Sequence, residues 1–70
     1  MLSPRQVEIV TMVGRDGKTW EEVRDELGIS KSTVRMHVTR IRTKCNVAHR
    51  PPREGLTEVY YRVVQGGVGL

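Results

Sequence analysis

Phenylalanine is absent from this 70-residue sequence, which also has only one tryptophan, two tyrosines and one cysteine. With 37% hydrophobic residues, the core must be aliphatic and modest in size. The single Cys45 cannot form a disulfide within the chain, no apolar run approaches the ~20 residues that cross a bilayer, and no secretory leader is recognisable. These absences predict one small cytoplasmic domain without a membrane span, and they exclude a large enclosed catalytic pocket.

Acidic residues are missing from the middle of the chain. From Leu27 to Arg53 there are seven basic and no acidic residues, whereas the segments before and after carry net charges of −2 and −1. Such a positive block is typical of a polyanion partner, since each cation placed at a phosphate releases condensed counterions. A merely solvated basic face fits this charge pattern equally well. The residues between the charges therefore have to distinguish the two interpretations.

The first half of the chain predicts two helices from their caps. Ser3 with Gln6, and Thr19 with Glu22, have the spacing of capping boxes, in which side chains and backbone satisfy each other's hydrogen-bonding groups. Glycine is expected to end both helices in a left-handed conformation. The helices should span about 4–13, closed by Gly14, and about 20–27, closed by Gly28.

Two further helices are expected in the second half. Ser30 caps a helix over about 31–44, whose apolar residues recur along one face: Val34, Val38, Ile41 and Cys45. Two prolines interrupt the chain, and a fourth helix over about 52–64 has its own apolar stripe: Leu56, Val59, Tyr60 and Val63. We expect an all-α bundle of three to four helices in one domain, 1–65, and a flexible glycine-rich tail, 66–70.

The face of helix 31–44 opposite its apolar stripe carries short polar side chains and one methionine. Turning by 100° per residue places these side chains there: Ser32, Met36, Thr39 and Thr43. Cations surround them, with two at the edges and two towards the core: Arg35 and Arg40, then Arg42 and Lys44. A face meant only for water would mix in glutamates. A capped basic helix after a short helix and a glycine turn is typical of a helix-turn-helix, whose second helix enters the major groove of DNA.

The segments LSPRQVEIV, EEV, ELGISKSTVRMHV and NVAHR resemble the DNA-binding domain of LuxR/GerE-type transcription regulators, over about Leu2 to Arg50. The resemblance implies a sequence-specific regulator that binds double-stranded DNA with helix 31–44 in the major groove. It implies base contacts from Arg35, Met36 and Thr39. It also implies phosphate contacts from the start of the helix and its polar and basic neighbours: Lys31, Ser32, Thr33, His37, Arg40, Arg42, Thr43 and Lys44.

The sequence departs from the family pattern before the fourth helix. In the family this helix forms a dimer interface, whereas here PPREGL stands between Arg50 and Thr57. A homodimer is one expected assembly, and its candidate interface is the fourth apolar stripe: Leu56, Val59, Tyr60 and Val63. A second departure is Arg24, where the family has a small alanine.

Parts of the sequence are also compatible with functions other than DNA binding. The segments SPRQVEIV and TWEEVRDELGISKSTVR also resemble region 4 of bacterial sigma factors, so the alternative is an interaction module that docks on RNA polymerase or a host regulator. His37, Cys45 and His49 lack a fourth ligand and paired spacing, so no metal is expected. Trp20 stands among glutamates and is expected to cover the core rather than stack on a base. No paired carboxylates, activated nucleophile or phosphate loop is present, and we expect no enzyme, cofactor or small-molecule substrate.

Overall fold

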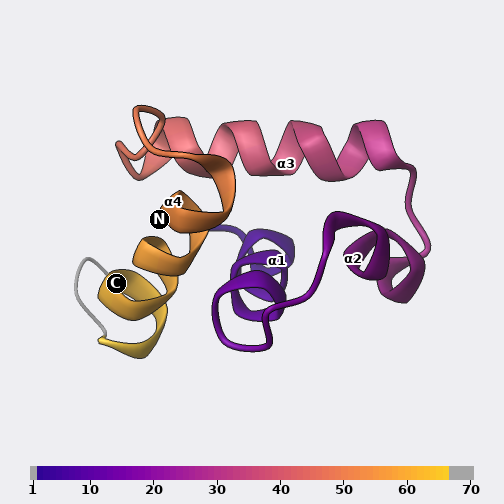
Figure 1. Cartoon of the computed structure of the whole chain (residues 1–70), viewed down its shortest axis with the longest axis horizontal. Helices are drawn as coiled ribbons and strands as arrows, with labels where there is room; N and C mark the ends of the chain where they lie inside the picture. Colours follow the sequence, from indigo (N-terminus) through magenta and orange to yellow (C-terminus); the bar gives the residue numbers. More distant parts are fainter. Residues whose placement is uncertain (1, 67–70) are drawn as a thin grey trace.

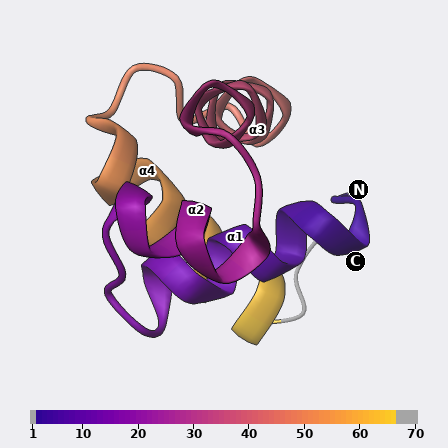
Figure 2. The same cartoon turned by 90° about the vertical axis from the view of Figure 1, so that its right-hand side faces the viewer.

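The computed structural model describes residues 2–66 of the chain, which contain four α-helices and one π-helical segment joined by loops. The elements are α1 (Pro4–Gly14), α2 (Trp20–Leu27), α3 (Lys31–Lys44), α4 (Pro52–Val59) and the π-helix η1 (Tyr60–Gln65). α3 lies across the top of Figure 1 with α1, α2 and α4 beneath it, and Figure 2 looks along its axis. The predicted all-α fold with a helix-turn-helix is confirmed, and residues 2–66 contain no strand.

The first two helices start at the predicted capping boxes. Ser3 Oγ accepts a hydrogen bond from the Gln6 backbone N–H at 3.2 Å, and Gln6 Oε1 accepts one from the Ser3 N–H at 3.0 Å. Thr19 and Glu22 repeat this pair of bonds at 3.1 and 2.9 Å. N–H groups in a first helical turn have no partner within the helix, so these side chains fix where each helix begins. The bond from the Thr19 backbone also lowers the pKa of Glu22.

Gly14 does not end α1 in a left-handed conformation, so that prediction was wrong. α1 includes Gly14, and the glycines with positive φ among residues 2–66 are Gly17 at 66° and Gly28 at 65°. Gly14 is needed for space instead. A Cβ on it would lie 2.5 Å from Tyr60 Cβ and 3.0 Å from Tyr60 Cγ. Glycine therefore lets α1 and η1 approach closely, which is a tertiary requirement that the local sequence does not reveal.

The core is aliphatic and receives side chains from every element. The predicted α3 stripe lies in it, since Val34 and Ile41 are 0% exposed and Val38 is 6% exposed. Trp20 is half-buried against this core, as expected of a cover. The other buried apolar residues are Leu2, Ile9, Val10, Val13, Val23, Val47, Leu56, Val59 and Tyr60. The burial pattern fixes which face of α3 points outward.

The C-terminal segment differs from the single helix expected over 52–64. α4 ends at Val59, and the chain continues as η1, after which the Gly66 N–H donates to the Tyr61 carbonyl at 3.1 Å. No sequence pattern in Tyr60–Gln65 predicts that the helix widens from α-helical to π-helical turns there. Of the tail expected at 66–70, all but Gly66 lies outside the described residues.

The fourth apolar stripe packs within the chain. Leu56, Val59 and Tyr60 are at most 8% exposed, and α4 and η1 both contact α1. Val63 is half-buried against the same core. The stripe expected as a candidate dimer interface thus packs on α1 within the same chain. An apolar surface that is already buried inside one chain is not available to a second copy.

Candidate nucleic-acid interface

A three-residue turn joins α2 to α3. Gly28 has φ 65° and ψ 34°, and its N–H donates to the Arg24 carbonyl at 2.9 Å. Glycine is favoured there because it has no Cβ to clash in the left-handed region. Ile29 packs against the core, and Ser30 Oγ accepts from the Thr33 N–H at 3.1 Å to begin α3. Together with the buried α3 stripe, this turn leaves the opposite face of α3 exposed.

The outer face of α3 carries most of the residues expected to contact DNA. Met36 is 41% exposed, although it is apolar, and Thr39 is exposed beside it. Met36 lies on the face that turns away from the core and is not among the side chains packed against it. The expected phosphate contacts that are exposed on α3 are Lys31, Ser32, Arg40, Thr43 and Lys44.

Three of the expected phosphate contacts are half-buried, and two of them are hydrogen-bonded within the protein. Arg42 Nη2 donates to the carbonyls of Ala48 and Arg50 at 2.9 and 2.7 Å, so this side chain braces the loop after α3. Thr33 Oγ1 lies 2.8 Å from Ser30 Oγ. His37 Nδ1 is buried and has no hydrogen-bond partner within residues 2–66. These three side chains are therefore less available to a phosphate than their exposed neighbours.

Ion pairs take up many of the cations outside α3. The pairs are Arg15–Asp16, Lys18–Glu26, Arg24–Asp25, Arg50–Glu58 and Arg62–Glu58. Exposed pairs like these add little stability, but they neutralise charge locally. α3 has no acidic residue, and its Lys31, Arg35 and Arg40 make no side-chain hydrogen bond or ion pair in the described part of the chain, as is also true of Arg5. The uncompensated positive charge is therefore concentrated on α3.

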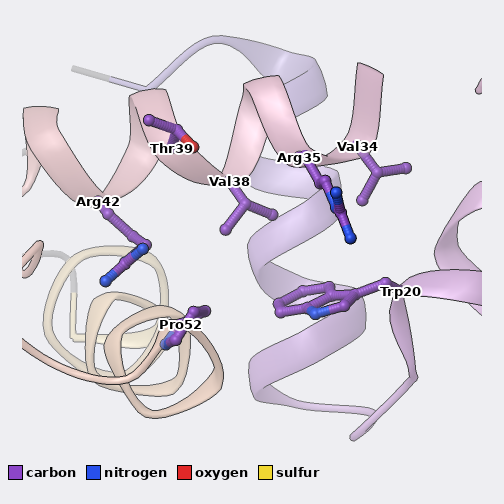
Figure 3. A pocket seen from close by; sticks show the side chains of 7 residues that line it. All are labelled: Trp20, Val34, Arg35, Val38, Thr39, Arg42 and Pro52. Atoms are coloured by element: carbon purple, nitrogen blue, oxygen red, sulfur yellow. The ribbon is translucent and has the colours of Figure 1, made fainter. Parts of the chain in front are cut away.

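A hollow of about 230 Å³ lies along one flank of α3, between α2 and the start of α4. Arg35 and Trp20 face each other across it, and Arg42 lies beside Pro52 at its other end (Figure 3). The complete lining is Trp20, Val34, Arg35, Val38, Thr39, Arg42 and Pro52. No lining residue is acidic. The hollow therefore combines an apolar surface with two positive charges.

Arg53 holds one wall of this hollow in place, a role that no local sequence signal indicates. Its Cζ lies 5.6 Å from the centroid of the Trp20 ring, and its Nη1 donates to the Lys18 carbonyl at 2.7 Å. These contacts join the PPREGL segment to the loop between α1 and α2. They could not be predicted because the partners are far apart in the sequence.

Neither metal binding nor a bilayer-crossing helix is indicated for residues 2–66. No three histidine, cysteine or acidic side chains come together there in a way that could hold a metal ion. Burial raises the pKa of the Cys45 thiol, which packs half-buried against the core. None of the helices in this part has the length and apolar character needed to cross a membrane.

Comparison with known proteins gives one family. The model for bacterial regulatory proteins of the luxR family matches residues 1–52, which include α1, α2, the turn and all of α3. The match ends inside PPREGL, where the sequence departs from the family pattern. Searches of curated proteins and of solved structures found no match.

Proposed function

Because the chain belongs to the luxR family of bacterial regulatory proteins and is thus a helix-turn-helix DNA-binding regulator, we propose that it recognises a specific DNA sequence with α3 in the major groove. The major groove is about 12 Å wide and admits one α-helix. The family consists of DNA-binding regulators rather than enzymes. We place its action in the bacterial cytoplasm, where the chromosome lies.

The observation that carries the proposal is the set of unpaired cations on α3. Lys31, Arg35 and Arg40 have no acidic neighbour on their own helix and no internal partner in the described chain, whereas the cations of α2 and η1 are paired. Phosphates that bind such cations release counterions, which drives association with DNA of any sequence. A helix with this charge in a helix-turn-helix is suited to a duplex.

Base recognition is assigned to the middle of the outer face. Met36 can pack on a thymine methyl, and Thr39 can hydrogen-bond to a base edge. Arg35 stands at the border of this face, within reach of a guanine or of the backbone. The exposed residues around them supply phosphate contacts, which position the helix without selecting a sequence: Lys31, Ser32, Arg40, Thr43 and Lys44.

The experiment is a titration of labelled random duplex with the protein at 50 and 200 mM salt, followed by selection of the bound sequences. We expect salt-dependent binding and enrichment of a motif. Thr39→Ala should cost about 0.5–1.5 kcal/mol on that motif and relax the preference at one position, whereas Arg40→Gln should weaken all duplexes alike. Arg62→Gln removes the same charge from η1, which does not contact α3, and serves as the control.

Binding without enrichment would refute sequence recognition. The basic face of α3 would then be tested as a docking surface for RNA polymerase, which is the alternative function. A two-fold symmetric motif would show that two copies bind together, through a surface other than the buried stripe of α4 and η1.

A further inference from the structure

We propose that the hollow beside α3 binds one sugar–phosphate unit of the DNA backbone, with the phosphate on Arg35 and the deoxyribose against Trp20 and Pro52. The proposal rests on the DNA-binding function above and assigns the ligand of a site that this function does not require.

The lining of the hollow matches both halves of such a unit. The Trp20 ring and Pro52 offer an apolar surface, with two buried valines behind them, while Arg35 and Arg42 bring positive charge. Thr39 adds a hydroxyl donor. An inorganic anion would leave the apolar wall uncovered, and a nucleobase would bring no negative charge to the guanidinium groups. A sugar–phosphate unit satisfies both surfaces at once.

The position of the hollow is where a backbone strand should pass. The major groove is about 8.5 Å deep and an α-helix with its side chains is about 10–12 Å across, so a helix in the groove has a strand at each flank. The hollow lies at one flank of α3, and Thr39 belongs both to its lining and to the outer face. A strand that follows this flank would lie beside Arg35.

The hollow is also formed in advance of binding. Arg53 stacks on Trp20 and is anchored on the Lys18 carbonyl, while Arg42 is fixed by two carbonyls. Carbonyl groups are neutral, so these bonds orient the guanidinium groups and leave their charge in place. Arg35 is the lining cation without an internal partner in the described chain, and its donors remain for a phosphate.

The proposed backbone contact of Arg35 and the base contact that the family resemblance implies have different consequences for sequence specificity. If Arg35 binds the backbone, sequence is recognised by Met36 and Thr39, and loss of Arg35 weakens binding to every duplex by a similar factor. If Arg35 instead binds guanine, its loss weakens binding mainly to the preferred sequence.

Trp20 provides the test, because it is the single tryptophan of the chain and lines the hollow. We would titrate the protein with duplex carrying a red fluorophore, following its anisotropy together with Trp20 emission and acrylamide quenching. Binding should change the emission and protect Trp20, with both signals saturating together. Arg35→Gln should lower affinity alike on selected and random duplexes. It should also make the slope of log affinity against log salt concentration shallower by about 0.9. Between 50 and 200 mM salt, the variant would then lose three- to fourfold less affinity than the wild-type protein loses.

Arg62→Gln is the matched control, expected to keep the slope and the protection of Trp20. Duplex binding that leaves Trp20 equally open to acrylamide would overturn the hollow as a backbone site while the proposed function stands. A loss confined to the selected motif in Arg35→Gln would also overturn it, by making Arg35 a base contact. Anisotropy that stays flat with wild-type protein would refute both proposals.

Discussion

Replacing Gly14 by alanine tests how closely α1 and η1 approach. Within a helix, glycine is less favourable than alanine by about 0.5–1 kcal/mol, so helix propensity alone predicts that Gly14→Ala stabilises the fold. The structure predicts the opposite sign. The added Cβ would lie 2.5 Å from Tyr60 Cβ, whereas carbon atoms in contact prefer about 3.5–4.0 Å.

The size of the stability loss in Gly14→Ala depends on which part of the protein has to move to make room for the new Cβ. Tyr60 Cβ is attached to the backbone, so no change of side-chain rotamer relieves the contact, and η1 has to shift by about 1 Å to reach an ordinary separation. Overpacking of this kind costs about 1–3 kcal/mol. After the gain in propensity of about 0.5–1 kcal/mol is subtracted, we expect a net loss of about 1 kcal/mol and at most about 2.5 kcal/mol. For a domain of this size, each kcal/mol lowers Tm by about 4–8 °C.

The assay is thermal and urea denaturation followed by circular dichroism at 222 nm. Glu8→Ala, on the exposed side of the same helix, is the control and should melt within a few degrees of wild type. A Gly14→Ala protein that melts at or above the wild-type temperature would show that α1 and η1 do not pack as described.

Two further variants test the core and the capping box of α2. Val38→Asp places an unpaired carboxylate at a site that is 6% exposed, and we expect loss of the helical signal at 25 °C; a cooperative melt near that of wild type would mean that α3 is rotated. Glu22 has a lowered pKa in the folded protein, so its stabilising effect is complete above its unfolded pKa of about 4.3 and is lost as pH falls through the lower folded value. Glu22→Gln should therefore flatten the acid side of the stability profile, and an unchanged profile would exclude a role for this carboxylate in acid denaturation.

Local signals predicted most of the fold. Each of α1, α2 and α3 begins at a side chain that accepts a hydrogen bond from its own first turn, so a few adjacent residues fix the start. The left-handed Gly28 and the α3 stripe follow from equally local rules. Val47 in the core was missed, although Asn46, with φ 59°, is a residue type that adopts the left-handed turn directing it there.

Features that depend on distant partners could not be predicted. The reason for Gly14 lies in Tyr60, and the reason for the Arg53 position lies in Trp20 and Lys18. For the candidate site, periodicity identified the outer face of α3. It could not show that Arg42 is bonded to carbonyls, because that depends on the path of the loop after α3. Nor could it show that Arg35 stands over a hollow, because that depends on where α2 and α4 lie beside α3.

The ion pairs outside α3 have a consequence for how the protein first meets DNA. A protein with cations spread over its whole surface would be attracted to a duplex in many orientations, most of them unproductive. Here the carboxylates of α2 and α4 cancel nearby cations, so the attractive field comes mainly from the side that carries α3. A protein that approaches a duplex is thereby oriented with the α3 side towards the DNA before contact, which raises the fraction of encounters that lead to binding.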